Sequence, residues 1–216
     1  MDAIIIAGGK GQRMEALIPK ALVVVKGKPL VAHQINFLFK SGIEKIILAL
    51  GFKAEQVIDY IKSHYPNANI EYTIEKKLLG TAGALKLALQ KSNADYVVAL
   101  NCDDVTDMDV SKLKEKKENT ICVAHPVLQF GRIREKNDYA EFEEKPLLKD
   151  WVSCGWYVLN RTQILELLPD KGSLEYDVFP KIKLRIFKHE SFWRTVNTKK
   201  DVTEFEKVEL PDVLKN

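Results

Sequence analysis

The chain has 216 residues, enough for one domain, and 46% of them are hydrophobic, which suffices for a substantial core. Its net charge of +3, from 33 basic and 30 acidic residues, is too small to indicate a nucleic-acid partner. The three cysteines form no CxxC pair and no apolar run reaches membrane-spanning length, so we expect a cytoplasmic protein without a membrane partner, structural zinc or disulfides.

The first predicted element is a buried strand that runs into a glycine-rich loop. The strand is the apolar run Ile4 to Ile6, and positions 8 to 11 hold three glycines. Glycines let successive backbone N–H groups converge on an anion, and Arg13 and Lys20 add two cations. The loop matches neither the dinucleotide fingerprint nor the P-loop. It predicts a cradle for a triphosphate.

The next elements alternate between helix and strand. Apolar residues at helical spacing predict helices over 30–40, 53–64 and 82–91, the last with Thr81 as its N-cap. Apolar runs predict strands over 46–50, 70–74 and 96–100. This alternation predicts an α/β, Rossmann-like fold with three layers, in which a mostly parallel sheet carries helices on both faces.

The second half has a different pattern. Short strands are predicted over 120–125, 130–134, 139–142, 151–158 and 192–196 and near 186, with helices over 163–168, 175–183 and 199–208. They predict a small mixed or antiparallel extension that covers the rim of the sheet. No linker-like segment separates the halves, so we expect residues 1–216 to form a single domain.

Polar groups follow the predicted ends of the parallel strands. Ligands of such sheets bind outside the carboxyl ends of the strands. This rule brings the loop 8–20, the turn 79–83 and the pair Asp103 and Asp104 to one rim. Asp104 and Asp107 are left open between a supporting role and ordinary loop acids.

These segments together resemble the sugar-1-phosphate nucleotidyltransferase family. The run IAGGKGQRM at 6–14, followed by Pro19 and Lys20, is similar to the family signature, and similar LGTAGA, NGD, EKP and SLExD segments follow at 79–84, 101–103, 144–146 and 173–177. The mannose- and heptose-1-phosphate guanylyltransferase-like members are the most similar in pattern. The resemblance implies an enzyme that transfers a nucleoside monophosphate from an NTP to a sugar 1-phosphate, releases pyrophosphate and uses Mg²⁺.

The resemblance also implies a role for each matching residue. The implied catalytic residues are Arg13 for the β- and γ-phosphates, Lys20 for the α-phosphoryl oxygens, and Asp103. The implied nucleotide-binding residues are Ala7, Gly8, Gly9, Gly11, Glu75, Gly80 and Thr81. The implied sugar-phosphate-binding residues are Glu144, Lys145, Gly155 and Glu175, and the implied metal ligands are Asp103 and Asn197. Residues 1–110 would then form a nucleotide-binding half and residues 111–216 a sugar-phosphate-binding half.

The chain departs from the family pattern at two motifs. Cys102 replaces the glycine of NGD, and residues 193–201 read WRTVNTKKD where many relatives have WxDxGTPxD. Thr195 therefore replaces the second metal-binding aspartate, and Asn197 is the predicted ligand in its place, with Thr195 as the alternative. Glu75 stands where uridylyltransferases have glutamine, and a carboxylate can accept from two N–H groups of guanine, which slightly favours GTP.

Two other functions stay open at this point. A cytidylyl- or uridylyltransferase acting on another phosphate acceptor shares the short loop spacing. A catalytically weak regulatory homologue is the second alternative, because the segment from Thr195 to Asn197 is altered. A homo-oligomer is also left open.

Overall fold

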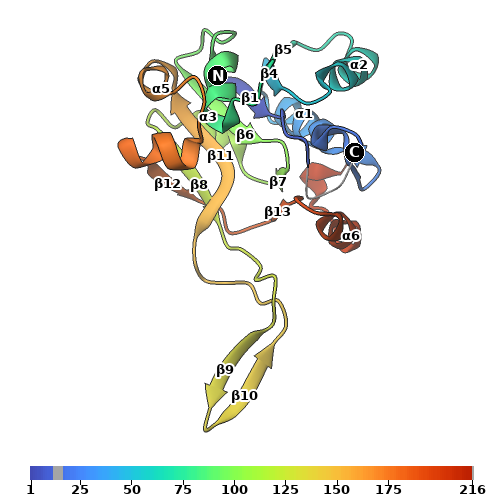
Figure 1. Cartoon of the computed structure of the whole chain (residues 1–216), viewed down its shortest axis with the longest axis vertical. Coiled ribbons are helices and arrows are strands. Elements are labelled where there is room, and N and C mark those ends of the chain that lie inside the picture. The colour runs from blue at the N-terminus through green and yellow to red at the C-terminus, as the bar shows by residue number, and fades with distance from the viewer. Residues whose placement is uncertain (12–16, 216) are drawn as a thin grey trace.

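A computed structural model of the chain describes residues 1–11 and 17–215, and a seven-stranded mixed sheet lies at its centre (Figure 1). The strand order is β12 (Arg185–Lys188), β8 (Thr120–Ala124), β11 (Val152–Asn160), β6 (Tyr96–Asn101), β1 (Asp2–Ile6), β4 (Ile46–Leu50) and β5 (Ile70–Ile74). The strands β6, β1, β4 and β5 run parallel, whereas β11 is antiparallel to both β6 and β8.

Helices cover both faces of this sheet. Successive residues of a strand point to opposite faces, so Ile5 packs in one apolar core and Ile4 in the other. The first core includes residues of α1 (Leu30–Lys40), α2 (Ala54–His64), α4 (Val110–Lys114) and α6 (Lys199–Lys207), and the second includes residues of α3 (Gly80–Leu89) and α5 (Arg161–Leu167). The predicted three-layer α/β fold is therefore confirmed.

The first-half elements lie within about two residues of their predicted bounds, with one difference at the third helix. Helix α3 begins at Gly80, so Thr81 lies in its first turn and does not cap it. The Thr81 hydroxyl instead accepts a hydrogen bond from the N–H of Leu174 at 2.9 Å. The N-cap prediction for Thr81 is wrong because this hydroxyl satisfies a backbone group of a distant segment.

The second half extends the same sheet, and one part of it leaves the body of the molecule. The hairpin formed by β9 (Arg132–Lys136) and β10 (Tyr139–Glu143) projects away from the sheet, although the sequence predicts strands that cover the rim (Figure 1). A separate antiparallel pair, β7 (Asp104–Thr106) with β13 (Trp193–Thr195), follows the end of β6. A smaller pair joins β2 (Val24–Val25) to β3 (Lys28–Pro29).

The predicted helix over 175–183 is wrong. The chain forms a π-helical turn, Leu174–Val178, followed by a 3₁₀ turn, Phe179–Lys181. Pro180 lies at the start of the second turn, and a proline inside a continuous helix has no N–H donor and clashes with the preceding turn. The hydroxyl of Ser173 caps the first turn by accepting from the N–H groups of Glu175 and Tyr176.

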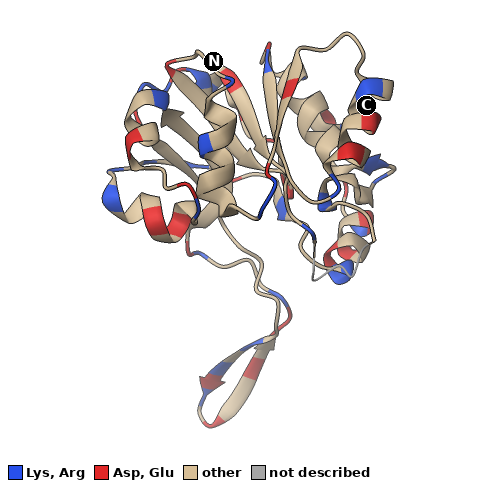
Figure 2. Ribbon diagram, turned by 45° about the horizontal axis from the view of Figure 1, so that its top comes forward, with Lys and Arg blue, Asp and Glu red and all other residues tan. Residues whose placement is uncertain are grey.

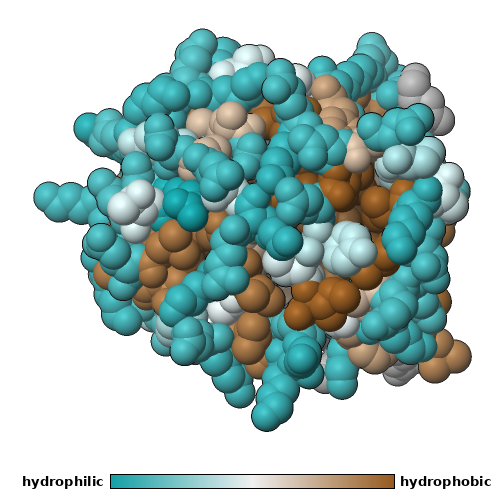
Figure 3. Space-filling model, turned by 90° about the horizontal axis from the view of Figure 1, so that it is seen from above, coloured by the Kyte–Doolittle hydropathy of each residue, from teal (hydrophilic) through white to brown (hydrophobic). Residues whose placement is uncertain are grey.

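The surface carries charges of both signs. Basic and acidic residues are interspersed along the helices and the projecting hairpin (Figure 2). Seen from the end opposite the hairpin, hydrophilic side chains surround separate apolar patches (Figure 3). Within residues 1–11 and 17–215, no helix is both long and apolar enough to cross a bilayer.

Candidate active site

The ends of β1 and β6 lie side by side because these strands are neighbours in the sheet. Ile6 pairs with Asn101, and the N–H of Cys102 donates to the carbonyl of Ile6 at 3.1 Å. The glycine loop after β1 therefore starts next to the polar segment after β6. Both segments lie at the carboxyl rim of the sheet, where the strand order predicts a ligand site.

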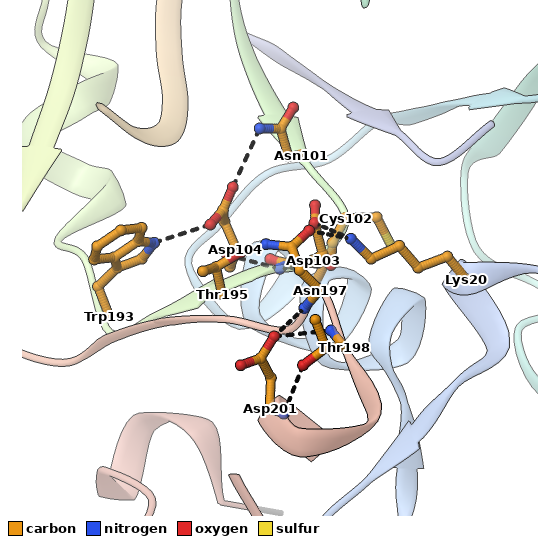
Figure 4. Close-up of polar contacts among 11 residues, drawn as sticks. Lys20, Asn101, Cys102, Asp103, Asp104, Trp193, Thr195, Asn197, Thr198 and Asp201 are labelled. Atoms are coloured by element: carbon orange, nitrogen blue, oxygen red, sulfur yellow. Dashed lines mark hydrogen bonds and ion pairs between the residues drawn. The ribbon is translucent and has the colours of Figure 1, made fainter. Parts of the chain in front are cut away.

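Lys20 reaches this rim from the far end of the glycine loop. Its N–H donates to the carbonyl of Gly9 at 3.4 Å. Gly11 has a φ of +61°, and a Cβ on it would lie 3.3 Å from the Cβ of Lys20, so a side chain at Gly11 would strain the loop. The Lys20 ammonium forms an ion pair with Asp103 and donates to Oδ1 of Asn197 at 2.7 Å (Figure 4). Three distant segments of the chain meet at this ammonium.

The segment after β13 sets the orientation of Asn197. Its Nδ2 donates to Oγ1 of Thr195 at 2.8 Å, which leaves Oδ1 toward Lys20. Its backbone N–H donates to the carboxylate of Asp201 at 2.9 Å. Asp201 also forms a capping box with Thr198 at the start of α6, the helix start that the sequence predicts. The cap therefore holds the backbone that carries Asn197.

Asp104 is buried directly behind this cluster. Its carboxylate accepts hydrogen bonds from Nδ2 of Asn101 and Nε1 of Trp193, each at 3.1 Å (Figure 4). Burial first, and then the negative charge of Asp103, raise the pKa of Asp104 from its ordinary value of 3.8 to about 7. Asp104 thus has a supporting role, since it joins the end of β6 to β13.

Trp193 is a supporting residue that the sequence motifs did not assign. Its indole N–H donates to Asp104, one of the two loop acids whose role the sequence left open. The sequence did contain a signal for this role, since Trp193 begins the segment that carries the predicted metal ligand Asn197. A partly buried indole N–H needs a hydrogen-bond acceptor, and nearby acidic residues are candidates.

Gly155 lies against the same carboxylate. Its φ is +74°, at a point where the register between β11 and β8 shifts. A Cβ on Gly155 would overlap with Oδ2 of Asp104. The glycine therefore makes room for a side chain of this protein, and its contact with a sugar stays a prediction.

A cavity of about 290 Å³ lies beside the Lys20–Asp103 pair. Backbone and side chains from the glycine loop, the start of α3 and the end of β6 form its walls. Its lining includes every predicted nucleotide-binding residue except Gly11, together with two predicted catalytic residues: Ala7, Gly8, Gly9, Glu75, Gly80, Thr81, Lys20 and Asp103.

Glu75 both lines this cavity and supports its wall. Its Oε2 accepts from the N–H of Leu79 at 2.8 Å, directly before α3. A Cβ on Gly8 would lie 2.9 Å from Oε1, so this oxygen is close to the glycine loop. The contacts show a structural role for the carboxylate, and its contact with a base stays a prediction.

The start of α3 packs against the turn that precedes the π-helical segment. A Cβ on Gly80, whose φ is +73°, would overlap with the carbonyl of Gly172. Oε2 of Glu175 accepts from the hydroxyls of Ser173 at 2.6 Å and Thr81 at 3.4 Å. The structure thus brings Glu175, predicted for the sugar phosphate, next to Thr81, predicted for the nucleotide.

A second cavity, of about 350 Å³, lies along β13 and contains Lys145 in its wall. Trp193 and Thr195 line the same cavity, and the Lys145 ammonium is 3.8 Å from Oε1 of Glu204. Glu144, by contrast, is exposed, and its carboxylate lies near Gly131 at the root of the hairpin. The predicted pair is therefore split, with Lys145 alone facing this cavity.

Arg13, the third predicted catalytic residue, lies outside the described residues. Among the described residues, the site included, no group of three or more His, Cys, Asp or Glu side chains could hold a metal ion. Asp103 and Asn197 nevertheless offer two oxygens that converge on one cation, the Lys20 ammonium. Hard oxygen ligands of this kind fit Mg²⁺ when phosphate oxygens supply further ligands.

Comparisons with known proteins give the class. The model of the Nucleotidyl transferase family matches residues 2–199, so the chain belongs to this family. It is similar to D-glycero-α-D-manno-heptose 1-phosphate guanylyltransferase of Campylobacter jejuni, with 32% identity over 95% of this chain and 98% of the relative. It is also 32% identical to mannose-1-phosphate guanyltransferase of Emericella nidulans, covering 93% of this chain but 62% of that protein.

A solved structure is similar to this chain over nearly its whole length. HddC from Yersinia pseudotuberculosis, complexed with GMP-PN, shares 25% identity and a TM-score of 0.78, and the match covers 95% of this chain and 98% of that one. The family membership makes the chain an enzyme, a sugar-1-phosphate nucleotidyltransferase. The resemblance found in the sequence is confirmed.

Proposed function

We propose that the protein transfers a guanylyl group from GTP to a sugar 1-phosphate, forming a GDP-sugar and pyrophosphate. The convergence of Lys20, Asp103 and Asn197 beside the 290 Å³ cavity is the observation that carries this proposal. Guanine is supported by the names of the relatives, which are guanylyltransferases, and by the guanine nucleotide analogue in the similar solved structure.

To catalyse this transfer, the protein mainly has to position the two substrates and neutralise the negative charge of their phosphates. An oxygen of the sugar phosphate attacks the α-phosphorus, the bond to the β-phosphate oxygen breaks, and pyrophosphate leaves. The attacking phosphate is already an anion, so no general base is needed, and charge neutralisation dominates. Lys20 stabilises the α-phosphoryl oxygens and Lys145 binds the incoming phosphate, while Arg13 stabilises the β- and γ-phosphates.

Asp103 and Asn197 would hold Mg²⁺, which when bound supplies positive charge against the phosphate oxygens. Asn197 is neutral, so Asp103 contributes the anionic ligand. Thr195 accepts a hydrogen bond from Nδ2 of Asn197, which supports Asn197 rather than Thr195 as the second ligand.

The two cavities support the predicted division of labour between the halves. The lining of the first runs from Ile6 to Asp103, within the nucleotide-binding half. The lining of the second runs from Pro126 to Val208, within the sugar-phosphate half. A cytoplasmic location stays a prediction, and the question of a homo-oligomer stays open.

A substrate panel tests the proposal. Pyrophosphate release is measured with GTP, UTP, CTP, ATP and dTTP, each against a set of sugar 1-phosphates that includes mannose and heptose phosphates. We expect the highest kcat/KM with GTP and one of these sugars. Preference for CTP or UTP would support the alternative transferases, and release with no pair despite retained nucleotide binding would support a regulatory homologue.

A further inference from the structure

The Lys20 ammonium contacts the same two oxygens that are the metal ligands in the proposed function. The inference drawn from this contact therefore rests on the proposed function. The ammonium contacts Oδ2 of Asp103 in an ion pair and Oδ1 of Asn197 at 2.7 Å. The Lys20 and Asp103 side chains are only 17% and 19% exposed, so solvent screens their attraction less than on an open surface. The ammonium and a divalent cation cannot take these two oxygens together, because the two positive charges would be in contact.

We propose that Lys20 is an exchangeable counter-ion of the metal site. It holds Asp103 neutralised until nucleotide phosphates draw the ammonium away, and the metal then enters together with the nucleotide. The same movement delivers Lys20 to the phosphate oxygens. Metal entry and the arrival of the catalytic cation are thereby coupled in one exchange.

The surrounding charges favour this coupling. Asn197 is neutral, and both oxygens of Asp104 already accept hydrogen bonds, from Asn101 and Trp193. Lys20 therefore neutralises the carboxylate of Asp103, the charged one of the two proposed ligands, and gives a free divalent cation little net charge to bind there. Lys20 lines the cavity that the proposed function gives to the nucleotide. Its flexible four-carbon stem allows the ammonium to move while the backbone stays in place.

The test measures binding of free Mn²⁺ to the full chain without nucleotide, from the loss of the free-ion signal in electron paramagnetic resonance. Lys20→Met keeps an unbranched side chain that is one atom shorter and removes its charge. We expect this variant to bind Mn²⁺ roughly tenfold more tightly than the natural chain or better. Adding Asp103→Asn to Lys20→Met should abolish the gain.

Lys53→Met is the matched control. Lys53 lies beside the same loop, with its ammonium on the carbonyl of Leu17 and over the ring of Phe52, and it has no contact with Asp103 among the described residues. Its removal should leave Mn²⁺ affinity unchanged. Lys20→Gln serves as a second variant if Lys20→Met does not give the natural circular dichroism spectrum.

The outcomes separate this inference from the proposed function, because the readout needs no turnover. Equal Mn²⁺ affinities for the natural chain and the Lys20 variants, in an enzyme that releases pyrophosphate, would overturn the exchange and leave the function standing. Tighter binding in the Lys20 variants alone supports the exchange, even if the substrate panel rejects the reaction. An equal gain in Lys53→Met would overturn it, since any nearby cation would then have the same effect.

Discussion

Two glycines with nearly the same φ angle have different surroundings. Gly155 and Gly27 have φ values of +74° and +76°, a region that strains any residue with a Cβ. A Cβ on Gly155 would overlap with the Asp104 carboxylate. One on Gly27 would meet no atom within 4 Å among the described residues other than its neighbours in the chain. A side chain would therefore strain the backbone at both positions, but only at Gly155 would it also collide with a neighbouring side chain.

We expect Gly27→Ala to lower the free energy of unfolding by about 1 kcal/mol, from strain alone. Gly155→Ala should lower it by roughly 3 kcal/mol or more, because Asp104 must also move away from Asn101 and Trp193. Urea denaturation of both variants measures the difference. Equal losses would show that the contact with Asp104 does not constrain Gly155.

Glu75 is the residue on which base selectivity is predicted to depend. A carboxylate can accept from both the ring N–H and the exocyclic amine of guanine, whereas a glutamine oxygen accepts alongside a donor amide. We expect Glu75→Gln to lower the ratio of kcat/KM for GTP over UTP by roughly tenfold or more. A ratio that does not change would limit Glu75 to its hydrogen bond with Leu79. Circular dichroism checks that the variant as a whole stays folded.

At the scale of secondary-structure elements, two helices start with similar caps in different places. Thr198 begins α6 directly after Asn197, and Asn160 begins α5 by accepting from the N–H of Gln163 at 3.0 Å. The two caps stabilise their helices in the same way, through a side-chain oxygen on an unpaired N–H group. The cap of α6 alone borders the proposed metal ligand.

Thr198→Ala and Asn160→Ala should each lower the free energy of unfolding by about 1 kcal/mol. We expect turnover to fall only in Thr198→Ala, because loosening of α6 displaces Asn197. Denaturation and pyrophosphate release are measured on the same preparations. If both variants keep full turnover, the cap supports the fold and not the site.

At the scale of the whole molecule, stability also depends on groups that are not part of the site, and His33 is one of them. It is buried on α1, and its Nε2 lies 2.8 Å from the carbonyl of Val25. Burial is the main cause that lowers the pKa of His33 below its ordinary 6.5. The unfolded chain therefore binds a proton more readily than the folded chain at pH values just below 6.5.

This difference in proton binding sets the sign of the effect on stability. The contribution of His33 to stability is fully present above pH 6.5 and is lost as the pH falls through the lowered pKa of the folded state. We expect His33→Gln, which can keep the hydrogen bond, to lose less stability than the natural chain between pH 7.5 and 5. Urea denaturation at both pH values measures this, and parallel losses would contradict the assignment to His33.

The sheet and most of the cavity lining could be predicted because they depend on local pattern. Apolar runs placed β4 and β5 within their observed bounds, and the rule for parallel strands placed Lys20 near Asp103. The contact between Gly155 and Asp104 could not be predicted, because it depends on a register shift between two strands. The direction of the projecting hairpin likewise depends on how its root packs, and periodicity does not encode this.

The central proposal is that nucleotidyl transfer takes place at Asp103, together with Asn197 and Lys20. The most direct test is the rate of GDP-sugar formation by Asp103→Asn against the natural chain, at saturating GTP and the preferred sugar 1-phosphate. We expect the rate to fall by roughly a hundredfold or more, with the circular dichroism spectrum preserved. A folded Asp103→Asn enzyme whose rate stays within a few-fold of the natural chain would contradict this assignment.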